Sequence, residues 1–146
     1  MGRGRHAIPL ARAGFRTFGV DRRLDAVQSA VAAARGQGLT ILGWCADLTV
    51  TPLPPSRFAV VVVTRYLQRD LFAALRQTTA PGGFVLYETF TRAQRALGVG
   101  PTSPDHLLEP EELRGCFSGF DVLFYEEVLA PEAVARIVAR RRLSAS

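Results

Sequence analysis

The segment from Phe58 to Thr64 constrains the fold more than any other part of this sequence. Its residues, Phe-Ala-Val-Val-Val-Val-Thr, form one apolar run and lack the alternation of a strand that has one face in water. A run of this length is typical of a strand in a parallel sheet that helices cover on both faces. The segment therefore predicts a buried parallel strand and, with it, an α/β fold.

Strand and helix patterns alternate on both sides of this segment. Upstream, the spacing of apolar residues predicts a helix, a strand, a helix and a strand over residues 5–13, 15–20, 22–35 and 40–44. Downstream, it predicts a helix over 67–78 and a strand over 84–88, with Pro81-Gly82-Gly83 as the turn between them. This alternation predicts a doubly wound, mostly parallel sheet in a single domain spanning residues 1–146.

The C-terminal part of the sequence has a different pattern. Residues 91–110 are rich in glycine, proline and polar residues and predict a loop over the site, with short helices at 92–97 and 110–117. Strands are expected over 120–128 and 134–139. The five residues between them are too few for a parallel crossover and suit a hairpin. The sheet is therefore expected to end in one antiparallel strand.

Composition excludes several classes of protein. All 18 basic residues are arginine, a bias that a GC-rich coding sequence explains. The cluster Arg136, Arg140, Arg141 and Arg142 is interpreted as a solvated terminus, and since no aromatic residues interleave with it, nucleic-acid binding is not expected. No run of eighteen uncharged apolar residues occurs, so no membrane span is expected.

The two cysteines, Cys45 and Cys116, have neither the paired spacing of a zinc site nor the density of a disulfide scaffold. A cytoplasmic protein without a metal site is therefore expected. The arginine-rich start also has the composition of a mitochondrial transit segment, but the helix and strand predicted there account for it better.

A glycine-rich turn opens the first predicted helix. In Gly2-Arg3-Gly4 the glycines let the backbone pass close to a ligand, and the start of a helix offers unpaired N–H groups. Asp21 ends the next strand at about the spacing at which an acid accepts hydrogen bonds from ribose hydroxyls. The two features together predict a nucleoside ligand at the carboxyl ends of the strands.

Four motifs resemble successive motifs of class I S-adenosylmethionine-dependent methyltransferases. They are Gly2-Arg-Gly-Arg-His-Ala, Gly19-Val-Asp21, Cys45-Ala-Asp47-Leu48 and Pro81-Gly82-Gly83. Arg65-Tyr66-Leu67, Tyr87-Glu88-Thr89-Phe90 and the segment 107–113 are similar to a bacterial small-molecule group related to tellurite-resistance methyltransferases. The resemblance implies a Rossmann-like methyltransferase fold, S-adenosyl-L-methionine as the cofactor and a small-molecule methyl acceptor.

The resemblance also implies a set of cofactor-binding residues: Gly2, Gly4, Asp21, Arg22, Asp47, Leu48 and Thr64. In the family's pattern the glycines pass under the methionine part, and Asp21, with Arg22 beside it, holds both ribose hydroxyls. Asp47 accepts from the adenine amino group, Leu48 lies against the ring and Thr64 lies beside the methionine end. For both aspartates the alternative is a helix N-cap, which is a common role for Asp after a strand.

Methyl transfer from a sulfonium requires positioning in a water-poor pocket and no fixed catalytic constellation. The catalytic residues are therefore left open. Candidates to orient the acceptor are Tyr66, Glu88, Thr89 and His106, on loops expected near it. Alternatively, Tyr66 is a packed aromatic and His106 a surface residue, and His6 is interpreted as a packing or capping residue.

The start of the chain departs from the family's pattern. Family members have a hydrophobic strand, ending in an acid and a glycine, before the residue equivalent to Gly2, whereas Met1 stands there in this sequence. Without that central strand, neighbouring strands would expose unpaired backbone edges. We expect a truncated start; a misassigned start, or closure of the gap by the remaining strands, are the alternatives.

Two other functions remain open at this stage. Gly2-x-Gly4-x-x-Ala7 with Asp21 also satisfies the dinucleotide spacing of a nicotinamide-dependent oxidoreductase. The second open function is that of a non-catalytic domain, a truncated relative that keeps the methyltransferase fold. Asp47 and the closing hairpin favour the methyltransferase. The methyl acceptor and the oligomeric state do not follow from the sequence.

Overall fold

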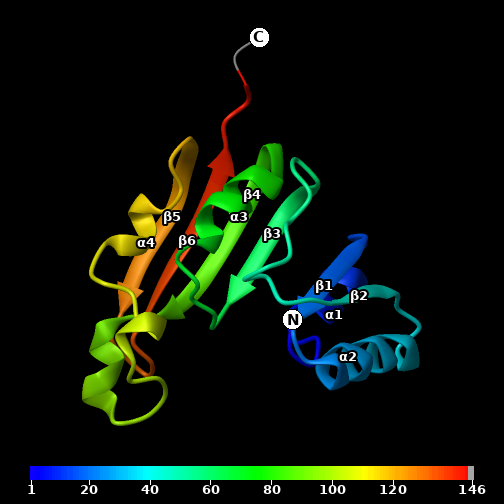
Figure 1. Cartoon of the computed structure of the whole chain (residues 1–146), viewed down its shortest axis with the longest axis horizontal. Helices are drawn as coiled ribbons and strands as arrows, with labels where there is room; N and C mark the ends of the chain where they lie inside the picture. The colour runs from blue at the N-terminus through cyan, green and yellow to red at the C-terminus, as the bar shows by residue number, and fades with distance from the viewer. Residues whose placement is uncertain (145–146) are drawn as a thin grey trace. The chain divides into compact units, whose positions relative to one another are not determined.

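The computed structural model describes residues 1–144. The chain divides into two compact units, Met1–Pro52 and Leu53–Ser146. The first unit contains α1 (Ala7–Arg12), β1 (Thr17–Asp21), α2 (Leu24–Gly36) and β2 (Ile41–Cys45). The second contains β3 (Phe58–Thr64), α3 (Leu71–Thr78), β4 (Thr79–Phe90), η1 (Arg92–Leu97), η2 (Pro104–His106), α4 (Glu112–Gly115), β5 (Phe120–Val128) and β6 (Val134–Arg141) (Figure 1).

In the first unit, β1 and β2 form a two-stranded parallel sheet. Both helices cover the same face of it, because Ile41 of β2 packs in one cluster with Ala7 of α1 and Ala34 of α2. Gly43 lies on that face too, and a Cβ atom at this position would stand 2.6 Å from a methyl group of Val27. The absence of a side chain at Gly43 therefore lets α2 approach the sheet closely.

In the second unit, the strand order is β3-β4-β6-β5, with β3 and β4 parallel and β6 antiparallel to both of its neighbours. The helices α3 and α4 lie over the same face of this sheet (Figure 1). Beneath them the rings of Phe72, Tyr87 and Phe117 pack with centroids 5.2–6.2 Å apart. This aromatic cluster forms the centre of the unit's core.

The predicted α/β fold with a mostly parallel strand arrangement and a C-terminal hairpin is confirmed. Phe58–Thr64 is a parallel strand with the predicted bounds, but its residues are half-buried or exposed, so the predicted burial was wrong. The strands β5 and β6 pair as an antiparallel hairpin. The antiparallel strand β6 lies inside the sheet, however, because β5 pairs along its outer edge. The strands of the described residues form two sheets, β1-β2 and β3-β4-β6-β5.

The turn predicted at Pro81-Gly82-Gly83 lies inside β4. This strand begins at Thr79, which pairs with Phe58, and residues 80–83 bulge out before the regular pairing with β3 resumes at Phe84. Gly82 has a φ of 75°, which favours glycine. The strand prediction for 84–88 was therefore too short at both ends.

The helices α3 and α4 are shorter than predicted, each starting later than the apolar pattern indicated. For α4 the reason is local: Glu111, which precedes it, has a φ of 60° and cannot belong to a right-handed helix.

The interpretation of Arg136, Arg140, Arg141 and Arg142 as a solvated terminus was wrong. The first three belong to β6, and Arg136 pairs with Glu88 of β4 and Glu126 of β5 at N–O distances of 2.5 and 2.8 Å. The other three donate to the carbonyl of Gly82, to the carbonyls of Gln77 and Thr79, and to the carboxylate of Asp121. These arginines stabilise the sheet because its neighbouring segments supply the acceptors.

The two thiols are expected to react at different rates. Cys45 is exposed, whereas Cys116 is half-buried, and burial, together with the nearby Glu112, raises the pKa of the Cys116 thiol to about 11. Since the thiolate is the reactive form, a thiol reagent at about pH 8 should modify Cys45 rapidly and Cys116 slowly, with the slow rate rising towards pH 11. Ellman's reagent measures both rates, and a fast phase that survives in Cys45→Ser would contradict this assignment.

Candidate cofactor-binding site

Asp21, the last residue of β1, holds the glycine turn at the start of the chain. Its Oδ2 accepts a hydrogen bond from the N–H of Gly2 at 2.8 Å and lies 3.2 Å from the amino group of Met1. Its Oδ1 accepts from the N–H of Arg23 at 2.9 Å. Gly2 and Gly4 have φ values of 53° and 90°, so both use the left-handed region that favours glycine. The glycine turn and the acid therefore meet, as predicted.

Several effects act on the pKa of Asp21. Partial burial acts to raise it, but the hydrogen bonds from the N–H groups of Arg23 and Gly2 and the nearby amino group of Met1 outweigh this and lower the pKa. Asp21 is therefore a carboxylate at neutral pH. A carboxylate offers about four acceptor positions, so the three N–H partners leave capacity for a hydroxyl group.

Asp47 lies at the same edge of the sheet as Asp21. Asp21 is opposite Cys45 in the parallel register, and the N–H of Ala46 donates to the carbonyl of Asp21 at 3.1 Å. Both aspartates thus follow the carboxyl ends of neighbouring strands, which is the arrangement that the sequence predicted.

The carboxylate of Asp47 closes a local turn. Its Oδ1 accepts from the hydroxyl and the N–H of Thr49 at 2.6 and 2.9 Å, and these bonds lower the pKa of Asp47. The alternative that the two aspartates are helix N-caps was wrong, because neither side chain caps a helix. Within residues 1–144, the Oδ2 of Asp47 has no hydrogen-bond partner, so one oxygen stays open to a ligand.

Arg22 and Leu48 complete the predicted residues of this edge. The carbonyl of Arg22 accepts from the thiol of Cys45 at 3.6 Å, and the charge of Arg22 contributes to the lowered pKa of Asp47. Leu48 is half-buried beside Asp47. Both residues therefore belong to the same cluster as the two aspartates.

Three of the candidates to orient the methyl acceptor, Tyr66, Glu88 and Thr89, lie in the second unit at the carboxyl ends of β3 and β4. Thr64 pairs with Glu88 in the register, and the carbonyl of Tyr66 accepts from the hydroxyl of Tyr87 at 2.5 Å. Tyr66 is 42% exposed and its own hydroxyl donates to the side chain of Gln68, so it is not a packed core aromatic. Thr89, by contrast, is buried.

Glu88 is engaged in an ion pair. Its carboxylate lies 2.5 Å from the guanidinium of Arg136, which Glu126 also contacts from β5. This ladder across three strands fixes the side chain, which favours a positioning role for Glu88 over that of a free general base. His106 is exposed at the end of η2.

Arg65 belongs to the motif Arg65-Tyr66-Leu67, but the sequence assigned it no role. It has a φ of 54°, its guanidinium forms two hydrogen bonds with Glu132, and it lies 5.1 Å from the ring centroid of Phe90. Its N–H also donates to the carbonyl of Glu88 at 2.8 Å. No signal in the sequence indicates this, because Glu132 is distant along the chain and follows a different strand.

Gln94 is a second residue of this unit to which the sequence assigned no role. It is buried, accepts from the N–H of Ala133 at 2.7 Å and donates to the carbonyl of Val99 at 2.9 Å. Leu107 and Leu108 in the same segment are fully buried. The segment 91–110, predicted as a loop over the site, is therefore tied to the turn of the β5–β6 hairpin and packed into the core of its unit.

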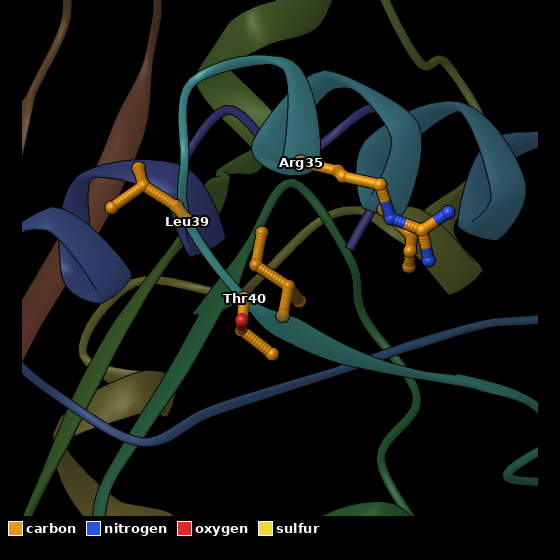
Figure 2. Close-up of a pocket in the computed structure, with 5 residues that line it drawn as sticks. Arg35, Leu39 and Thr40 are labelled. Atoms are coloured by element: carbon orange, nitrogen blue, oxygen red, sulfur yellow. The ribbon is translucent and has the colours of Figure 1, made fainter.

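A hollow of about 110 Å³ lies elsewhere in the first unit (Figure 2). Val31, Arg35, Leu39, Thr40 and Ile41 line it. Because Ile41 begins β2, the hollow is at the amino end of that strand, whereas Asp21 and Asp47 are at the carboxyl end. It therefore does not belong to the candidate site.

Two further features bear on the predictions. Among residues 1–144, no three His, Cys, Asp or Glu side chains gather in a way that could hold a metal ion. In the same part of the chain, no helix has both the length and the apolar character that crossing a membrane requires.

Comparison with solved structures identifies the fold. A search of protein-family models and a search of curated proteins find no match. An S-adenosylmethionine-dependent methyltransferase from Mesorhizobium loti is similar to this chain with a TM-score of 0.77 at 21% identity, over 96% of this chain and 87% of that one. TehB from Haemophilus influenzae has a TM-score of 0.78 at 16% identity, over 97% of this chain and 55% of its own length.

A third similar structure is the geranyl diphosphate C-methyltransferase from Streptomyces coelicolor A3(2). Its TM-score is 0.75 at 14% identity, over 96% of this chain and 69% of that chain. At such identities the likeness concerns the fold. The chain has the Rossmann-like α/β fold of S-adenosylmethionine-dependent methyltransferases.

Proposed function

We propose that this chain binds S-adenosyl-L-methionine and transfers its methyl group to a small-molecule acceptor. One observation carries the proposal: the glycine turn, Asp21 and Asp47 meet at the carboxyl edge of two parallel strands in a chain with the methyltransferase fold. Ligands of doubly wound sheets bind at this edge.

The residues at this edge fit an adenosine group. Asp21 has acceptor capacity for ribose hydroxyls, and Arg22 lies next to it. Asp47 has an open oxygen for the adenine amino group, with the apolar side chain of Leu48 beside it. A Cβ atom at Gly2 would meet no atom within 4 Å, so there is open space above the turn for the rest of the cofactor.

Bound S-adenosyl-L-methionine supplies a methyl group on a positively charged sulfur, and the protein's task is to bind, orient and exclude water. In this proposal Gly2 and Gly4 lie along the methionine part. Tyr66, Glu88 and His106 orient the acceptor, and Arg136 holds Glu88 in place. Tyr66 is exposed, and its hydroxyl, which donates to Gln68, can still accept a hydrogen bond from the methyl acceptor.

A small acceptor is supported by the similarity to geranyl diphosphate C-methyltransferase. A cytoplasmic location remains a prediction, and the two free thiols are in keeping with a reducing compartment.

Calorimetric titration of the full chain with S-adenosylhomocysteine, the demethylated product, tests the proposal. We expect saturable binding near one molecule per chain and none of NADH under the same conditions. Asp47→Ala should weaken binding by about tenfold to a hundredfold, since a hydrogen bond to a charged group contributes roughly 1.5–3 kcal/mol. A stable NADH complex without binding of S-adenosylhomocysteine would favour the oxidoreductase and end this proposal.

A further inference from the structure

The glycine turn of the first unit fixes the backbone on both sides of Arg3. The N–H of Gly4 donates to the carbonyl of Met1 at 3.2 Å and closes a β-turn. Gly2 and Arg3 are the two central residues of this turn. The N–H of Gly2 is held by the carboxylate of Asp21 at 2.8 Å, and Gly4 is buried against side chains of α1 and α2. The structure therefore determines where the backbone of Arg3 lies, at the tip of the turn.

The side chain of Arg3 is exposed, and within residues 1–144 its guanidinium forms no hydrogen bond and no ion pair. The neighbouring arginines have other contacts. Arg23 forms an ion pair of 2.6 Å with Asp25, and Nε of Arg5 donates to the adjacent histidine ring at 3.2 Å. Arg22 already belongs to the proposed ribose end of the site. Arg3 is thus the arginine of this turn whose charge has no partner in the described chain.

The proposed position of the cofactor brings its methionine part to Arg3, so this inference rests on the proposed function. With the ribose at Asp21, the methionine part leaves the ribose beside Gly2, whose N–H bonds that same carboxylate. A Cβ atom at Gly2 would meet no atom within 4 Å, so the space on this side of the turn is open. Consecutive Cα atoms are about 3.8 Å apart, which places Arg3 next to this space.

The methionine part ends in an α-carboxylate and an α-ammonium group. Asp21 is itself a carboxylate at neutral pH and repels the α-carboxylate, so a cation is needed close to the turn. A guanidinium matches a carboxylate with two parallel hydrogen bonds, whereas it repels an ammonium group. We propose that Arg3 binds the α-carboxylate and thereby selects the complete cofactor over adenosine derivatives that lack this group.

Three ligands separate the parts of the cofactor in calorimetric titrations of the full chain. S-adenosylhomocysteine carries both charged groups of the methionine part. Its decarboxylated analogue keeps the ammonium group and lacks the carboxylate, and 5′-methylthioadenosine lacks both. The parent protein should bind S-adenosylhomocysteine more tightly than either of the other two, because only this ligand offers a carboxylate to Arg3.

Arg3→Gln should weaken binding of S-adenosylhomocysteine by about threefold to tenfold. This range lies between that of an exposed ion pair and that of a hydrogen bond to a charged group. The affinity for 5′-methylthioadenosine should not change, and the decarboxylated analogue should bind no worse than it binds to the parent. Arg3→Lys keeps the charge without the planar fork, so it should recover part of the lost affinity.

Arg35→Gln is the matched control. It removes the same charge from the same unit, but Arg35 lines the hollow at the amino end of β2, away from the glycine turn (Figure 2). This variant should prefer S-adenosylhomocysteine over the decarboxylated analogue as strongly as the parent does. Raising the salt from about 0.1 M to 1 M should reduce that preference in the parent and change it less in Arg3→Gln. Circular dichroism and the thermal midpoint check that each variant is folded.

Four results would overturn this inference while the proposed function stands, because the parent would still bind S-adenosylhomocysteine. Arg3→Gln could keep the parent's preference among the ligands, or it could lose affinity for all three equally. Arg35→Gln could lose as much of the preference as Arg3→Gln, which would assign it to net charge. Arg5→Gln could lose it while Arg3→Gln does not, which would assign the contact to Arg5. A parent that binds none of the three ligands would instead end the proposed function, and this inference with it.

Discussion

Replacing Asp21 with asparagine should weaken binding of S-adenosylhomocysteine by about tenfold to a hundredfold. Asparagine keeps the shape but only one acceptor oxygen, so it can accept from the N–H of Gly2 or from that of Arg23, which bond different oxygens of Asp21, but not from both. It loses the negative charge and half of the acceptor capacity that two ribose hydroxyls require. A hydrogen bond to a charged group contributes roughly 1.5–3 kcal/mol, which corresponds to that range of affinity.

Asp25→Asn is the matched control for this experiment. Asp25 lies in the first turn of α2, is exposed and pairs with Arg23, and it has no contact with the glycine turn. Calorimetry should therefore give the parent affinity for Asp25→Asn and a reduced one for Asp21→Asn. The thermal midpoint should stay close to the parent for Asp25→Asn and fall slightly for Asp21→Asn, which loses one hydrogen bond of the turn. Equal affinities of the two variants would remove Asp21 from the proposed ribose site and leave it the role of holding the turn.

Gly43→Ala should destabilise the protein by about 1–3 kcal/mol, the usual cost of overpacking. The added Cβ would lie 2.6 Å from Cγ1 of Val27 and 2.9 Å from Cγ2 of Val31, both on α2. Valine has little freedom at χ1 in a helix, so these methyl groups cannot turn away, and α2 must move from the sheet. Urea denaturation measures the change in the free energy of unfolding.

Gly36→Ala is the control, with an expected change of opposite sign. Gly36 ends α2, and a Cβ atom there would meet nothing within 4 Å. Alanine restricts the unfolded chain, so this variant should be more stable by about 0.4–1 kcal/mol. If Gly43→Ala matched Gly36→Ala, the close approach of α2 to β2 would not be what Gly43 provides.

Local pattern was enough to predict most elements of the fold. Three of these predictions used only residues that lie close together in the sequence. They concern the apolar run at Phe58–Thr64, the helical spacing of apolar residues in α2 and the five-residue connection of the β5–β6 hairpin. The meeting of Asp21 with Gly2 was also predicted, because parallel strands place their carboxyl ends at one edge and the following residues gather there.

Contacts between distant segments were decided by the tertiary structure. Pairing of Thr79 with Phe58 lengthened β4 beyond the turn that Pro81-Gly82-Gly83 indicated. The arginines of β6 found acceptors on β4 and β5, and Arg65 found Glu132, which no local spacing encodes. Periodicity along the chain specifies which face of an element is apolar, and only packing specifies which charged partner or which helix meets that face.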